Sequence, residues 1–137
     1  MIVYLSGPIY PDNKEETDTW RQRAATYLKL AGIETFDPCR GKVIYTYGAF
    51  TPLEIVYRDL RDIDQSDLLL VNFNLLPNKL PIGTTMEIQH AFETKKPVVT
   101  VGTDPRVMTH PWIQAMAVRH FQELDDALEY IVNFWGH

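Results

Sequence analysis

Short apolar runs alternate with helix-length amphipathic segments along the chain, and this alternation constrains the fold more than any other feature. It is typical of a parallel β-sheet whose strands are connected by helices. We therefore predict an α/β fold with a parallel five-stranded sheet and helices on both faces. The expected strands are residues 1–7, 33–38, 67–73, 96–102 and, as a short edge strand, 118–124.

Helices are predicted where apolar residues recur at spacings of three and four. The expected segments are residues 15–30, 52–66, 85–94, 113–118, and a last helix capped by Asp125 or Asp126. Their apolar faces predict three inward-facing sets: Trp20, Ala24, Tyr27, Leu28 and Ala31; Ile55, Val56, Leu60 and Ile63; Ile88, Ala91 and Phe92.

Length and composition limit the classes of protein. A chain of 137 residues, 45% hydrophobic, has the size of one ordinary domain, so residues 1–137 are predicted to form a single domain. Its net charge of -5 argues against nucleic acid or an anionic membrane as a partner. The single cysteine, Cys39, and the absence of zinc-ligand spacing predict a reducing compartment without disulfide or structural metal. Without a leader or a long apolar run, we expect a cytoplasmic protein.

Residues 39–52 form a loop with an unusual content of aromatic side chains, including Tyr45, Tyr47 and Phe50 among glycines. Long loops in compact domains are often functional. Two interpretations remain open: these side chains face a ligand, or they fill a satellite core or a subunit contact.

Glu87 lies just after a Gly-Thr-Thr turn, which follows the third predicted strand through a loop. Ligands of open α/β sheets bind outside the carboxyl ends of the strands, so Glu87 is expected on that rim. Its position at a helix start is expected to favour the ionised carboxylate. The alternative is a capping box, in which Thr84 and Glu87 satisfy free backbone N–H groups.

Several catalytic classes lack their sequence patterns here. The phosphate-binding patterns G-x-x-x-x-G-K-[ST] and G-x-G-x-x-G are absent, as is the hydrolase pattern G-x-S-x-G. Carboxylate chemistry remains. Retaining glycosyl transfer needs a carboxylate nucleophile and a second group that protonates the leaving group and later takes a proton back. Asp59 is the candidate second group; its alternative is a solvated charge paired with Arg58 or Arg61.

Four segments in order along nearly the whole chain resemble the nucleoside 2-deoxyribosyltransferase family and its N-glycosidase relatives. They are "VYLSGPIY", "YRDLRDIDQSDLLLVNF", "PIGTTMEIQHAFETKKPVVTV" and "HPW…LDDALEYI". The resemblance implies a doubly wound, flavodoxin-like (Rossmann-like) fold. It also implies cleavage of the N-glycosidic bond of 2'-deoxynucleosides through a deoxyribosyl ester on glutamate, transfer of the sugar to another nucleobase, and no cofactor or metal.

The resemblance assigns roles by position. Glu87 corresponds to the nucleophile, Asp59 to the acid that handles the departing base, and Tyr4 to the phenol that holds the nucleophile; from the sequence alone Tyr4 is a core residue of a strand. The residues expected to bind substrate are Gly7, Pro8, Ile9, Gly83, Thr84, Met86, Arg40, Tyr47, Phe50, Thr109 and His110.

The expected partners are a deoxynucleoside, a free nucleobase, and further copies of the chain in a dimer-based homo-oligomer of up to four or six subunits. The resemblance implies that the "MTHPW" loop, including Thr109 and His110, completes a neighbouring subunit's site. Pro81 stands where some relatives have an acidic residue, and the turn "GPIYPDN" favours a nucleoside over a nucleotide. The alternatives are an N-glycoside hydrolase of nucleosides or nucleoside 5'-monophosphates, and a non-catalytic nucleoside-binding module.

Overall fold

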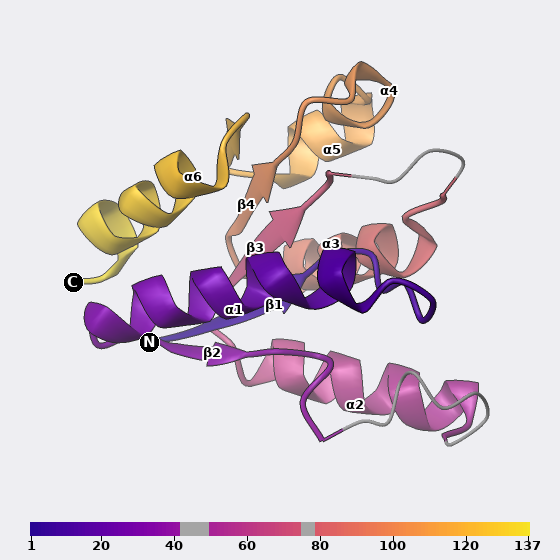
Figure 1. Ribbon diagram of the computed structural model, residues 1–137. Helices are drawn as coiled ribbons and strands as arrows, with labels where there is room; N and C mark the ends of the chain where they lie inside the picture. The colour runs from indigo at the N-terminus through magenta and orange to yellow at the C-terminus, as the bar shows by residue number, and fades with distance from the viewer. Residues whose placement is uncertain (42–49, 75–78) are drawn as a thin grey trace.

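The computed structural model describes residues 1–41, 50–74 and 79–137 (Figure 1). Its strands are β1 (Ile2–Ser6), β2 (Glu34–Phe36), β3 (Leu68–Asn72), β4 (Val98–Val101) and β5 (Arg119–Phe121). They form one sheet in the order β2-β1-β3-β4-β5, and every pair is parallel. This order confirms the predicted doubly wound, flavodoxin-like fold, and it places the switch in strand order between β1 and β3.

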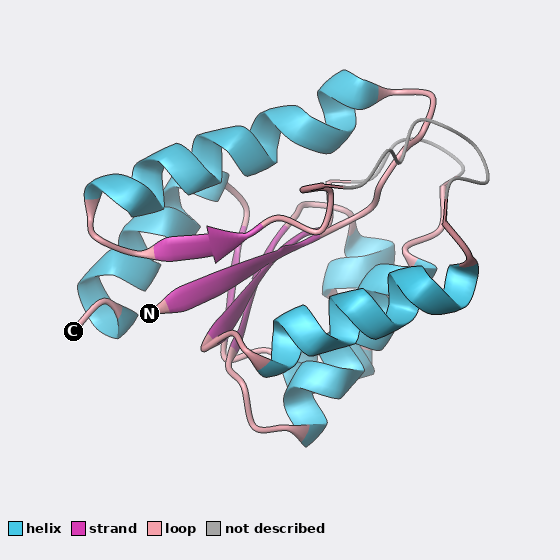
Figure 2. Ribbon diagram, turned by 90° about the horizontal axis from the view of Figure 1, so that it is seen from below, coloured by secondary structure: helices cyan, strands magenta, loops and turns pink. Residues whose placement is uncertain are grey.

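Helices cover both faces of the sheet (Figure 2). One face carries α1 (Lys14–Leu30), α6 (Leu124–Tyr130) and the π-helical turn η1 (Ile131–Trp135). The other carries α2 (Pro52–Asp64), α3 (Ile82–Glu93), α4 (Pro105–Met108) and α5 (Pro111–Met116). Val3 and Leu5 enter the first core and Tyr4 the second, because successive side chains of a strand point to opposite faces. No helix in the described ranges is long and apolar enough to cross a membrane.

The buried stripe of α1 is partly polar. Ala24 and Leu28 are buried as predicted, but Tyr27 is 40% exposed. Thr17 and Arg21 continue the stripe toward the start of the helix, and both are fully buried. They are buried because their polar groups bond backbone carbonyls in and beside the turn that follows β1. The inward predictions for Tyr27 and Ala31 are therefore wrong.

The start of α2 agrees with the predicted start at residue 52. Thr51 and Glu54 form a capping box, and Pro52 occupies the first helical position, where its missing N–H costs nothing. Ile63, near the end of the helix, is fully buried as predicted. Ile55 and Val56 are not inward-facing core residues, since they line the cavity described below.

Helix α3 begins at Ile82, three residues before the predicted start, with Pro81 as its N-cap and no side-chain cap. Thr84 is already inside the helix, so the capping box with Glu87 is wrong. Glu87 is the sixth helical residue and lies in the second turn. Ile88 and Ala91 are buried as predicted, whereas Phe92 is 51% exposed. One residue turns the helix by about 100°, which carries Phe92 away from the core.

The chain after β4 differs locally from expectation. A short helix, α4, was not predicted, and α5 begins two residues before the expected position 113. The last helix begins at Leu124 with Glu123 as its N-cap, so Asp125 and Asp126 lie inside its first turn and do not cap it.

Candidate active site

A cavity of about 470 Å³ lies at the carboxyl ends of β1 and β3, at the switch in strand order. Its walls come from the turn after β1, Pro38 after β2, residues 55–60 of α2, and residues 79–87, which run into the first two turns of α3. The volume falls in the range of small-molecule sites. Eight of the residues predicted for the site line it: Gly7, Pro8, Ile9, Asp59, Gly83, Thr84, Met86 and Glu87.

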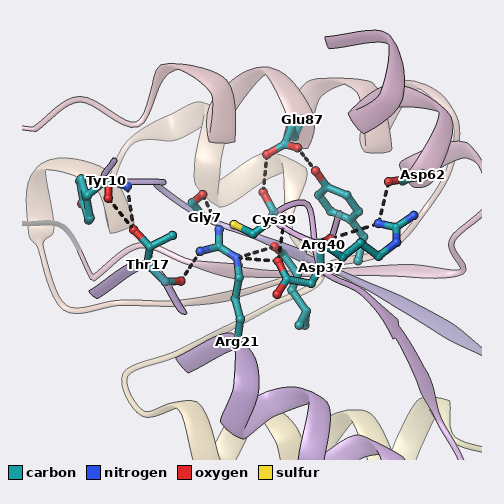
Figure 3. A network of polar contacts seen from close by, with 12 residues as sticks. Gly7, Tyr10, Thr17, Arg21, Asp37, Cys39, Arg40, Asp62 and Glu87 are labelled. Atoms are coloured by element: carbon teal, nitrogen blue, oxygen red, sulfur yellow. Dashed lines mark hydrogen bonds and ion pairs between the residues drawn. The ribbon is translucent and has the colours of Figure 1, made fainter. Parts of the chain in front are cut away.

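The Glu87 carboxyl is held at both oxygens by side chains of β1. The Tyr4 hydroxyl donates a short hydrogen bond to Oε2, and the Ser6 hydroxyl donates to Oε1 at 2.9 Å. Figure 3 shows these two contacts as dashed lines at Glu87. Tyr4 and Ser6 are both fully buried and share one side of β1, two residues apart. Two side chains of β1 therefore fix the orientation of the Glu87 carboxyl group.

Burial dominates the electrostatics of Glu87. It raises the pKa of the carboxyl to about 7, and the negative charge of Asp59 raises it further, while the hydrogen bonds from Tyr4 and Ser6 and the charge of Arg21 lower it. The expectation that the helix start favours the ionised form is wrong, because Glu87 lies beyond the first turn, to which the dipole effect is confined. The group exchanges its proton near neutral pH.

The Tyr4 phenol stays protonated. Burial raises its pKa far above the usual range, and the charges of Glu87 and Asp59 raise it further. Tyr4 is therefore a fixed hydrogen-bond donor to the carboxylate rather than a base.

The raised pKa of Glu87 predicts that the protein becomes less stable as pH rises toward the neutral range. Between about pH 4.5 and 7 the folded protein binds more protons at Glu87 than the unfolded chain, so the free energy of unfolding falls as pH rises. We expect Glu87→Gln to raise that free energy at pH 8 by on the order of 3 kcal/mol and to change it little at pH 4. Urea unfolding at both pH values measures this. The matched control is Glu93→Gln, on the exposed side of α3, whose effect on the free energy of unfolding should not depend on pH. An equal effect of Glu87→Gln at both pH values would contradict the prediction.

Arg21 stabilises the turn after β1, which forms one wall of the cavity. Figure 3 shows its side chain rising from α1 toward Gly7 and Thr17. Its guanidinium donates to the backbone oxygens of Thr17 at 2.5 Å, Gly7 at 2.7 Å and Leu5 at 3.3 Å, and it lies 3.8 Å from an Asp37 carboxylate oxygen. The side chain thus fixes the turn after β1, from which Gly7 lines the cavity.

Gly7 and Gly83 line the cavity for different reasons. A Cβ on Gly7 would lie 2.9 Å from the Trp20 ring and 3.1 Å from the backbone oxygen of Asn72, so this position requires glycine for packing within the protein. A Cβ on Gly83 would meet no atom of the described residues within 4 Å, which leaves open space on its cavity side.

Sequence reasoning missed Ser6 and Arg21. Ser6 could have been found from its spacing, because it follows Tyr4 by two residues on the same strand and therefore points to the same side of the sheet. Arg21 stands four residues after Thr17 and three before Ala24, on the same buried stripe. A charged residue at such a position is rarely assigned to the interior, because burial of a charge is costly without partners.

Arg40 and Phe50 do not line the cavity. Arg40 lies over the Phe36 ring at 4.5 Å and bonds the buried Asp62 carboxylate at 2.9 Å, which connects the end of the β2 turn to α2. Phe50 is 37% exposed just before α2. Tyr45 and Tyr47 lie outside the described residues.

Thr109 and His110 lie between α4 and α5, away from the Glu87 cavity. Thr109 donates to the Pro105 carbonyl, and His110 caps α5 by accepting from the Trp112 N–H at 3.3 Å. His110 lines a second cavity of about 400 Å³, which shares only Pro81 and Met86 with the first.

Two carboxyl groups line the cavity. They belong to Asp59 on α2 and Glu87 on α3, and the negative charge of Asp59 raises the pKa of Glu87. Within the described ranges no group of three or more His, Cys, Asp or Glu side chains is arranged to hold a metal ion. The chemistry available from these residues is nucleophilic attack by a carboxylate combined with proton transfer by a second one.

Solved structures with the same fold extend over almost the whole chain. The 2-deoxyribosyltransferase of Bacillus psychrosaccharolyticus is 19% identical, with a TM-score of 0.73 and coverage of 95% of this chain and 92% of that one. The Leishmania mexicana 2-deoxyribosyltransferase is 16% identical, with a TM-score of 0.73 and 97% coverage of both chains. A CMP N-glycosidase of Clostridium botulinum is 15% identical, with a TM-score of 0.61 and coverage of 98% and 100%.

Comparison of the sequence with family profiles identifies the family. No curated protein sequence matches the chain significantly. The family profile described as nucleoside 2-deoxyribosyltransferase, however, matches residues 3–128, which include every lining residue of the cavity and both of its carboxylates. The chain therefore belongs to the nucleoside 2-deoxyribosyltransferase family.

Proposed function

We propose that the protein cleaves the N-glycosidic bond of 2'-deoxynucleosides and transfers the 2-deoxyribosyl group to another nucleobase. One observation carries the proposal: the Glu87 carboxyl, held by Tyr4 and Ser6, lines a cavity together with a second carboxyl, that of Asp59. Membership of the family and the names of two similar structures agree with it.

In the first half-reaction, a carboxylate oxygen of Glu87 attacks C1' of the sugar. The C1'–N bond breaks, its electron pair passes to the base nitrogen, and Asp59 supplies a proton to the departing base. A 2-deoxy sugar lacks the electron-withdrawing 2-hydroxyl, so positive charge develops on C1' with less cost. The product is a deoxyribosyl ester of Glu87 and a free base.

In the second half-reaction, an incoming base attacks C1' through its nitrogen while Asp59 takes up the proton that this base loses. The ester bond breaks and its electron pair returns to Glu87 as a carboxylate. A pKa of about 7 suits this residue, because the same carboxylate must act as nucleophile and then as leaving group near neutral pH.

The walls of the cavity suit the two parts of a nucleoside. We assign the sugar to the side formed by Gly7, Pro8 and Gly83, close to Glu87, and the flat base to the apolar side chains of Ile55, Val56 and Met86. Thr84 and Ile9 also line the cavity. Thr109 and His110 are assigned to the site of a neighbouring subunit in a homo-oligomer, because they lie away from the cavity of their own chain.

Base exchange tests the proposal. Incubation with a 2'-deoxynucleoside and a different free base is expected to yield the exchanged nucleoside, separated by chromatography. A reaction without the acceptor base is the control. Release of the free base with sugar passing only to water would instead identify an N-glycoside hydrolase, the activity named for the similar structure from Clostridium botulinum. Neither product, with nucleoside binding retained, would identify a binding module.

A further inference from the structure

We propose that Ser6 is a positioning residue for Glu87, holding one carboxylate oxygen so that the carboxylate stays oriented and ionised for attack on the sugar. The inference rests on the proposed function, since it assigns Ser6 a part in the chemistry of Glu87. Ser6 itself is not assigned a contact with the substrate.

Geometry carries the proposal. Ser6 is the last residue of β1, pairs in register with Val71 of β3, and is fully buried. Its hydroxyl lies 2.9 Å from Oε1 of Glu87, while the Tyr4 hydroxyl bonds Oε2. A carboxyl held only by Tyr4 would keep rotational freedom about its last side-chain bond. The second hydrogen bond from the same strand removes that freedom.

Charged and titratable groups approach Glu87 from each surrounding element. Tyr4 on β1 donates a hydrogen bond, Asp59 on α2 opposes ionisation by its negative charge, and Arg21 on α1 favours it. Lys79, before α3, lines the same cavity. Ser6 carries no charge, so its effect comes through the hydrogen bond, which favours the ionised carboxylate against burial and Asp59.

The same bond affects both halves of the reaction. When a carboxylate oxygen attacks C1', the Ser6 hydroxyl keeps the carboxyl plane fixed. When the ester breaks, the hydroxyl stabilises the negative charge that returns to the carboxylate, which makes Glu87 a better leaving group. Loss of the hydroxyl is therefore expected to raise the pH needed for attack and to slow breakdown of the ester.

The test uses Ser6→Ala and Ser6→Cys, which remove the strong donor, and Ser6→Thr, which retains a hydroxyl. The matched control is Ser66→Ala, because the Ser66 hydroxyl is also buried but donates to the Asp62 backbone oxygen at 2.7 Å. Two quantities are measured on each folded protein: the titration midpoint of the Glu87 carboxyl carbon by NMR, assigned by its absence in Glu87→Gln, and the acid limb of kcat/KM for base exchange.

In Ser6→Ala and Ser6→Cys, both midpoints should rise by about one pH unit, equivalent to ~10-fold less ionised Glu87 below the midpoint. Ser6→Thr should restore the parent values, and Ser66→Ala should leave them unchanged. An unchanged NMR midpoint in Ser6→Ala and Ser6→Cys would overturn the inference, as would a shifted NMR midpoint with an unshifted acid limb. A parent protein without turnover would overturn the proposed function instead, and the NMR titration alone would then decide whether Ser6 holds Glu87.

Discussion

Glu87→Ala is expected to abolish base exchange, lowering kcat/KM by ~10³-fold or more, because it removes the group that forms the covalent intermediate. Asp59 remains in the cavity of this variant, but a proton donor alone does not supply the nucleophile. The loss should appear mainly in kcat, since the apolar walls that are assigned to the base are unchanged.

A trapped intermediate locates the nucleophile directly. Fluorine at C2' destabilises positive charge on C1' and slows breakdown of the sugar ester, so a 2'-fluoro-2'-deoxynucleoside should add the mass of one fluorinated sugar to the parent protein. Intact-protein mass spectrometry measures the adduct, and peptide mapping should place it on Glu87.

The control for trapping is Glu93→Ala. Glu93 lies on the same helix, is exposed, and accepts a hydrogen bond from Gln89 at 2.9 Å, so its loss should leave adduct formation unchanged. Glu87→Ala should form no adduct. An adduct on Glu87→Ala, or mapping of the sugar to Asp59, would contradict the assigned role of Glu87.

The fold could be predicted from sequence because its signals are periodic. Apolar runs such as that of β3 are buried on both faces, and their alternation with helices restricts the sheet to a parallel arrangement. The location of Glu87 near the ligand-binding edge follows from the parallel arrangement, since the loops after parallel strands all lie at the carboxyl edge of the sheet.

The details of the site depend on contacts across the sheet, which local patterns do not contain. A helix-start rule predicted an ionised Glu87, but burial between elements far apart in sequence determines its pKa. The apolar period of α2 predicts Ile55 and Val56 in the core, but they line the cavity, because the buried residues of that helix lie at its end. The Asp62 carboxylate, on the same helix, is buried because Arg40 bonds it.

Arg21→Met is expected to cause the largest loss of stability among single substitutions outside the apolar cores. It removes three hydrogen bonds that a fully buried guanidinium donates to backbone oxygens, those of Leu5, Gly7 and Thr17. A hydrogen bond from a charged group contributes about 1.5–3 kcal/mol, so the loss of three should lower the free energy of unfolding by about 3 kcal/mol or more. For a domain of this size, Tm should fall by roughly 10 °C.

The matched control is Arg23→Met on the same helix. Arg23 pairs with Asp125, and both side chains are more than half exposed, so this pair contributes about 0–1 kcal/mol. Thermal unfolding of the parent and the two variants at one pH provides the comparison. Equal Tm values for Arg21→Met and Arg23→Met would show that the buried guanidinium does not stabilise the turn. A large loss for Arg21→Met alone would establish that the turn lining the cavity depends on a cation held in the interior, against the usual preference for apolar residues there.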